Sequence, residues 1–183
     1  MENLKDENMG TNNRLPMLTG MFEDRESTER AYNALHERGY AKDDINLMMS
    51  DDTRNKHYSD VNDTSELGTK AAETAGTGSA IGGTIGAIVG VIAALGTSII
   101  IPGLGLVIAG PIAAGLAGAG AGGITGGLIG ALVGSGIPED RAKIYESGIN
   151  DGHVVLGVHP RNDDDAGYLE ENWKSNRGTN IYR

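Results

Sequence analysis

The side chains best suited to catalysis or metal binding are few in this chain and lie far apart in the sequence. The 183 residues include four histidines and no cysteine, so disulfides and thiolate chemistry are excluded. His153 and His159 flank one strand-like stretch, which separates them by ~20 Å, too far to share a metal ion. His36 and His57 are isolated polar residues. We therefore expect no catalytic residue and no metal site.

Three consecutive aspartates at residues 163–165 are the densest carboxylate cluster. A calcium loop alternates its ligands and ends with a distal Glu, and this cluster has neither feature. We expect these aspartates to cap a helix that carries Ala166, Leu169 and Trp173 on one face.

Two glycine patterns invite comparison with phosphate-binding loops. Residues 118–123 (GAGAGG) loosely imitate a dinucleotide fingerprint, but they follow no strand and lack the acidic residue ~20 positions later. No glycine between Gly76 and Gly136 precedes the Lys of a phosphate-binding loop. A net charge of −10 also argues against nucleic acid as a partner. We expect no cofactor and no small-molecule substrate.

The glycines organise the chain in another way. Residues 74–138 contain no Lys, Arg, Asp, Glu or His, and their glycines recur every four residues in two rows. Positions i and i+4 share one face of a helix, so each row predicts a helix with a groove free of side chains. Each interior glycine costs ~1 kcal/mol relative to Ala, a cost that close helix packing would offset. The rows are Gly78, Gly82, Gly86 and Gly90, and then Gly118, Gly122, Gly126, Gly130 and Gly134.

This pattern predicts a glycine-zipper helical hairpin over residues 74–137, with Pro102 and Gly103 at its tip. The arms would run from about Gly76 to Ile101 and from Leu104 to Gly134.

The charged segments around this run predict the rest of the fold. Residues 16–49 predict a strand, a helix ending near Arg38 and a second strand at 45–49, with Gly20 marking a bulge or a close neighbour. Residues 138–183 predict a helix after Pro138, a strand at 153–159, the capped helix and a last strand at 179–182. We interpret residues 1–15 as a disordered acidic tail and residues 50–73 as a polar linker.

The predicted order gives the fold class. Strand-helix-strand occurs twice, which is the order of an α+β ferredoxin-like βαββαβ sandwich, with four antiparallel strands and two helices on one face. The hairpin would then be inserted between strands 2 and 3. Both of its ends must emerge on the same side of anything that it enters.

Two segments resemble one protein family. Residues 17–48 (MLTGMFEDRESTERAYNALHERGYAKDDINLM) resemble the opening of the bacterial general stress proteins, also called heat-induced stress proteins. Residues 136–160 (GIPEDRAKIYESGINDGHVVLGVHP) and the stretch from Leu169 to Tyr182 resemble the part after that family's glycine-rich insert. The resemblance implies a non-enzymatic, stress-associated protein and carries over no catalytic residue.

Function then depends on what buries the glycine-rich run. Each arm exceeds the ~20 residues that cross a bilayer, and the uncharged tip suits a hairpin that stays within the lipid. We expect the protein to associate with a membrane from the cytoplasmic side, to self-associate there, and to shape or stabilise the bilayer. The alternative is a cytoplasmic homo-oligomer or interaction module whose hairpins lie in a shared core.

Overall fold

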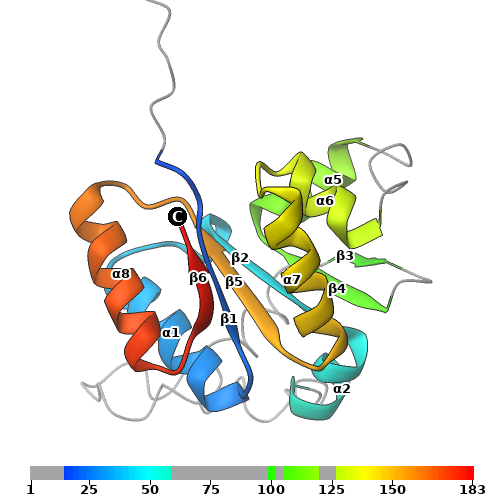
Figure 1. Cartoon of the computed structure of the whole chain (residues 1–183), viewed down its shortest axis with the longest axis horizontal. Helices are drawn as coiled ribbons and strands as arrows, with labels where there is room; N and C mark the ends of the chain where they lie inside the picture. Colours follow the sequence, from blue (N-terminus) through cyan, green and yellow to red (C-terminus); the bar gives the residue numbers. More distant parts are fainter. Residues whose placement is uncertain (1–14, 59–98, 102–104, 120–126) are drawn as a thin grey trace, which may run out of the picture.

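The chain folds as an α+β structure on one antiparallel sheet of six strands (Figure 1). The computed structural model describes residues 15–58, 99–101, 105–119 and 127–183. The strands are β1 (Leu18–Phe22), β2 (Ile45–Ser50), β3 (Ile99–Ile101), β4 (Leu106–Ala109), β5 (Val154–Val158) and β6 (Thr179–Tyr182). They follow the order β3-β4-β2-β5-β1-β6 across the sheet, and every neighbouring pair is antiparallel.

The described residues form six α-helices, which cover both faces of the sheet. Their bounds are α1 (Arg25–Glu37), α2 (Asp51–Tyr58), α5 (Pro111–Ala119), α6 (Gly127–Gly134), α7 (Glu139–Asn150) and α8 (Asp163–Ser175). Figure 1 shows three layers, with α1 and α8 on one side of the sheet and α5, α6 and α7 on the other. The short α2 lies beside β2 and β4.

The sheet separates two hydrophobic cores because successive side chains point to opposite faces. In β5, Val154, Leu156 and Val158 belong to the core under α1 and α8, whereas Val155 belongs to the core under α5, α6 and α7. A strand covered on both faces is expected to be a continuous apolar run, and the sequence of β5 has that character.

Most elements predicted outside the glycine-rich run are confirmed. The strands predicted at 45–49, 153–159 and 179–182 correspond to β2, β5 and β6, and the predicted helices correspond to α1, α7 and α8. Gly20 has the close neighbour expected of it, because a Cβ there would lie 2.8 Å from Trp173 Cε3. The aspartates at 163–165 occupy the first turn of α8, but the capping side chain is Asn162, which accepts from Asp165 N–H at 2.7 Å.

The prediction of one long helix from Leu104 to Gly134 is wrong. The chain forms β4 at Leu106–Ala109, and α5 begins only at Pro111. Val107 and Ile108 are β-branched and extend the sheet beside β2, where both of their faces are buried. Ile99–Ile101, predicted as the end of the first arm, forms β3 against β4. The tip residues Pro102 and Gly103 lie outside the described residues, as do residues 74–98.

Two further expectations also need correction. The sheet has two strands more than the four predicted, and helices cover both of its faces, because the region after residue 98 adds β3, β4, α5 and α6 to the domain. The predicted linker at 50–73 begins with helix α2. Ser50 accepts from Thr53 N–H at 3.0 Å, and Asp51 and Asp52 follow in the first turn, so a helix start was encoded there.

Candidate interaction surface

The glycine-rich helix α5 is joined to the sheet through Gly110. This residue follows β4 with φ +95°, a backbone conformation that favours glycine. A Cβ at Gly110 would lie 2.1 Å from the carbonyl oxygen of Ile45 on β2. Only glycine therefore allows the chain to leave β4 and start α5 so close to the neighbouring strand.

Asn46 supplies the cap that Gly110 cannot. The Gly110 carbonyl accepts the first backbone bond of the helix, from Ala114 N–H at 3.2 Å, but glycine has no side chain to cap the remaining donors. Asn46, fully buried on β2, accepts from Ile112 N–H through Oδ1 at 2.7 Å. Its Nδ2 donates to the Gly157 carbonyl on β5 at 3.4 Å. One side chain therefore connects α5 to the two central strands.

Helices α5 and α6 each have an inner side that packs against the sheet and an outer side that faces away from it. On the inner sides, larger side chains enter the core beside the sheet: Ile112, Ala113 and Leu116 from α5, and Leu128, Ala131 and Leu132 from α6. On the outer sides, residues at i, i+3 and i+4 are exposed or half-buried and carry no charge. This outer face consists of Pro111, Ala114 and Gly115 from α5, and of Gly130, Val133 and Gly134 from α6.

The outer face differs in chemistry from the outer sides of the other long helices. Ion pairs at i and i+4 lie on α1 (Arg30 with Glu26), on α7 (Lys143–Glu139, 2.7 Å) and on α8 (Lys174–Glu170, 2.6 Å). Such pairs are typical of helix surfaces in contact with water. The outer face has no charged residue, and its Val133 is 43% exposed, the highest value among the described large hydrophobic side chains. Small, uncharged residues therefore make up most of the outer face.

The predicted packing glycines fall in different parts of the chain. A Cβ added at Gly130 or Gly134 would meet nothing within 4 Å, so no described group occupies the space above them. Gly118 lies in α5. The remaining packing positions lie outside the described residues: Gly78, Gly82, Gly86, Gly90, Gly122 and Gly126.

The described residues hold no group of three His, Asp or Glu side chains that could bind a metal ion. His36 Nδ1 lies 3.3 Å from the Tyr40 carbonyl, and His159 Nδ1 lies 3.2 Å from the Leu15 carbonyl. Each of these ring nitrogens therefore lies within hydrogen-bonding distance of a backbone carbonyl.

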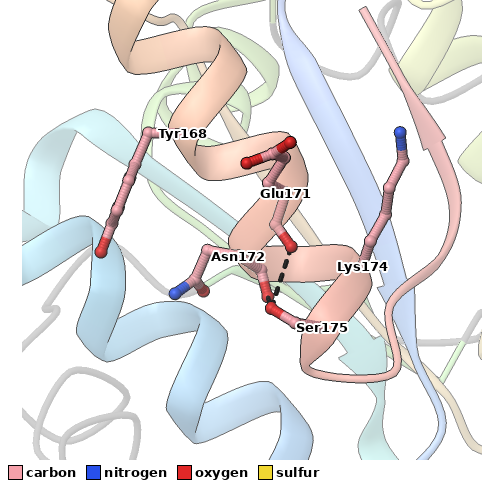
Figure 2. Close-up of a pocket in the computed structure, with 5 residues that line it drawn as sticks. All are labelled: Tyr168, Glu171, Asn172, Lys174 and Ser175. Carbon is pink, nitrogen blue, oxygen red and sulfur yellow. Dashed lines mark hydrogen bonds between the residues drawn. The ribbon is translucent and has the colours of Figure 1, made fainter.

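A shallow hollow lies on the exposed side of α8, and all of the residues that line it come from that one helix (Figure 2). The Ser175 hydroxyl lies 2.9 Å from the carbonyl oxygens of both Glu171 and Asn172, so it interacts with its own helix. Lys174 pairs with Glu170, and the Arg38 guanidinium stacks 4.0 Å from the Tyr168 ring centroid. These contacts are typical of a helix surface, without an activated nucleophile.

A second hollow, of about 350 Å³, lies between the start of β1 and the start of α7. Its two arginines are engaged with the protein. Arg141 Nη1 donates to the Arg183 carbonyl at 2.9 Å and stacks over Tyr182, and Arg183 Nε pairs with Glu170 at 3.0 Å. The arginines therefore join β6 to α7 and α8.

A polar cluster around the buried Asp165 joins the end of α1 to the start of α8. Asp165, 5% exposed, accepts from the Tyr40 hydroxyl at 2.9 Å and pairs with Arg161 and Arg38, each at 3.2 Å. The Tyr40 hydroxyl in turn accepts from the Arg161 backbone N–H at 3.0 Å. Every hydrogen-bonding group named here has a partner, as expected of a structural cluster.

The pKa values of three buried tyrosines and of the aspartate that caps α1 are perturbed, and each shift has a structural cause. Burial raises the pKa of Tyr32, Tyr58 and Tyr145 to about 12 in each case. For Asp24, burial alone would raise the pKa, but hydrogen bonds from Ser27 and the charges of Arg177 and Arg30 together lower it. Asp24 caps α1 by accepting from Ser27 N–H at 2.8 Å, so this shift has a structural origin.

Comparisons with known proteins identify no relative: no family model, curated protein or solved structure matches this chain. Among the described helices, none combines the length and the apolar character needed to cross a bilayer.

Proposed function

We propose that this protein acts without catalysis, as a stress-type protein that self-associates through its glycine-rich part, residues 74–137. The observation that carries the proposal is the outer face of α5 and α6, which is uncharged, built of small residues and free of described neighbours above Gly130 and Gly134. Small residues allow two helix backbones to approach closely, and this close packing offsets the helical stability that glycine loses. A second copy of the chain can provide the apolar surface that buries this part of the protein.

The order of four strands in the sheet supports the proposal of a stress-type protein. We infer that β1, β2, β5 and β6 with α1 and α8 form a ferredoxin-like unit. The order β2-β5-β1-β6 supports this inference, because it places the third strand of a βαββαβ unit between the first and second and the fourth beside the first. The region between β2 and β5 is then an insert, as in the bacterial general stress proteins that the sequence resembles.

Membrane association is the second candidate, and the sequence before β3 favours it. Residues 74–98 are uncharged and exceed the ~20 residues that span a hydrocarbon core. In this form the glycine-rich part would enter a bilayer from the cytoplasmic side and shape or stabilise it. Against it, glycine and alanine on the outer face offer lipid little apolar area, whereas they favour contact with another helix.

The test measures the molar mass of the full chain by light scattering over a wide range of concentration, with two matched variants. Val133→Asp puts a charge on the outer face, and Ile144→Asp puts the same charge on α7, where the side chain is 37% exposed. We expect a mass above that of one chain, a fall toward one chain in Val133→Asp, and no change in Ile144→Asp. A single-chain mass at every concentration would refute self-association.

A liposome flotation experiment separates the two candidates. If self-association is the function, the full chain sediments without vesicles and keeps its multimeric mass. Flotation with vesicles, lost in Val133→Asp but kept in Ile144→Asp, would replace the first candidate with the membrane form.

A further inference from the structure

The second hollow described above is basic, although the chain as a whole is acidic. Its volume of about 350 Å³ lies within the range of roughly 300–1,000 Å³ that is typical of small-molecule sites. The described residues that line it include Arg141, Arg183 and His159 but no Asp or Glu, whereas the chain has a net charge of −10. A ligand that enters this hollow therefore meets basic side chains first.

Parts of the chain that are distant in sequence meet at this hollow. The start of β1 lies beside the end of β6, since Thr19 pairs with Tyr182 (Figure 1). The first turn of α7 reaches the same end of β6, because Arg141 Nη1 donates to the Arg183 carbonyl. Thr19, only 2% exposed, is one of the lining residues. The hollow is therefore a recess between elements, unlike the shallow one on α8.

The protein holds both guanidinium groups of the hollow in place with only part of their hydrogen-bonding capacity. Each guanidinium carries several N–H donors in one rigid plane. Arg141 uses Nη1 on the Arg183 carbonyl and stacks 4.5 Å from the Tyr182 ring centroid. Arg183 uses Nε on Glu170 Oε2 at 3.0 Å. Each group thus has one polar partner within the described residues, and its other N–H groups can bind a ligand.

The start of α7 adds a partial positive charge beside the two arginines. The first N–H groups of a helix have no partner inside it, and Pro138 at the N-cap has no side chain that could accept from them. Pro138 lines the hollow, so the positive end of the helix lies at its wall. The acidic residues of this turn, Glu139 and Asp140, do not line it, and Glu139 pairs with Lys143 at 2.7 Å. The electrostatics of the hollow therefore favour an anion.

We propose that the second hollow binds a small soluble organic anion, whose carboxylate or phosphate head lies between Arg141 and Arg183. The planar fork of N–H donors in arginine matches the oxygen atoms of both kinds of head. Met17, Ile137 and Pro138 give the hollow apolar walls, which suit a short apolar body attached to that head. This binding goes beyond the proposed function, because no residue of the outer face lines the hollow. It also needs no catalytic residue.

Calorimetric titration of the full chain tests the proposal with phenyl phosphate and benzoate, and with benzyl alcohol as a neutral control. We expect at least one of the two anions to bind, one molecule per chain, and benzyl alcohol not to bind. Arg141→Gln and Arg183→Gln should each weaken binding at least roughly tenfold, because each removes charge-assisted hydrogen bonds to the head. Lys143→Gln removes the same charge from α7 outside the hollow, where the side chain is 60% exposed, and should change the affinity less than about threefold.

A second measurement needs no change at the arginines, which also join elements of the fold. In the protein with ¹³C-labelled methionine methyl groups, the aromatic ring of a bound probe should shift the NMR signal of Met17, which lines the hollow. The signal of Met48, fully buried and outside the lining, should stay in place.

Three results would overturn the inference. The first is that neither anion binds at millimolar concentration. The second is binding that leaves the Met17 signal unmoved, or that both folded arginine variants retain in full. The third is that the protein binds vesicles containing phosphatidic acid but neither soluble anion, since the head would then belong to a lipid.

Discussion

Asn46 Oδ1 accepts a hydrogen bond at 2.7 Å from the backbone N–H of Ile112, a residue 66 positions later in the chain. The bond links the central strand β2 to the first turn of α5, the helix that begins the second half of the glycine-rich part. Asn46 is therefore both a buried polar side chain of the sheet and the cap of α5. The position of α5, and hence of the outer face, depends on this contact.

The first prediction concerns this cap. Asn46→Ala removes the acceptor and leaves the Ile112 N–H buried without a partner, so we expect the free energy of unfolding to fall by about 1–3 kcal/mol. Urea denaturation measures the change. Asn55→Ala, at an exposed position of α2, should stay within about 0.5 kcal/mol of the native protein. A loss no larger than that for Asn46→Ala would show that water or a neighbouring group replaces the cap.

The second prediction concerns the close packing of β1 against α8. A Cβ at Gly20 would lie 2.8 Å from Trp173 Cε3 and 3.2 Å from Ile181 Cγ1. We therefore expect Gly20→Ala to destabilise the fold by about 1–3 kcal/mol, the usual cost of overpacking. Gly167→Ala, inside α8 with an ordinary 3.7 Å contact to Arg183 Nη2, should instead stabilise by up to ~1 kcal/mol through helix propensity. The denaturation midpoint should therefore fall in Gly20→Ala and rise in Gly167→Ala. Two midpoints that shift in the same direction would contradict this prediction.

The third prediction concerns the polar cluster between α1 and α8. Tyr40→Phe removes the hydroxyl that donates to Asp165 and accepts from the Arg161 N–H, so about 1–3 kcal/mol of stability should be lost. A double-mutant cycle with Asp165→Asn measures the coupling. Because the two side chains are in contact, the stability lost by the double mutant should differ from the sum of the two single losses by at least about 0.5 kcal/mol. Additive losses would mean that the side chains act independently.

The fourth prediction concerns alkaline pH. Burial raises the pKa of Tyr32, Tyr58 and Tyr145 from 10.0 to about 12, so the folded protein retains protons that the unfolded chain releases. The unfolded state then binds fewer protons above pH 10, and stability falls as the pH rises. We expect the denaturation midpoint to decrease between pH 10 and about 12. The absorbance of the three phenolates should appear at a higher pH in the folded protein than in the unfolded chain. Normal ionisation of all six tyrosines of the chain in the folded protein would contradict this prediction.

The elements outside the glycine-rich run could be predicted because their signals are local. The helix from Arg25 begins after a capping aspartate and ends before Gly39, whose φ of +79° favours glycine, and both signals are present in the sequence. The strand at Val154–Val158 is a short apolar run between polar residues. In these stretches local propensity and tertiary packing agree, so the pattern was sufficient.

The sequence by itself determined that residues 74–138 are uncharged and spaced for helix packing, and that the chain has the strand and helix order of an α+β domain. Only the tertiary structure decided that part of this run joins the sheet. Residues 106–109 could form helix or strand by their own preference, and the open edge of β2 selects the strand, because pairing there satisfies the backbone and buries both faces. The cap of α5 was equally hidden, since its acceptor lies on another strand. A partner distant in sequence leaves no local pattern. The sequence therefore could not predict that Asn46 caps α5, or that α5 and α6 together form the outer face.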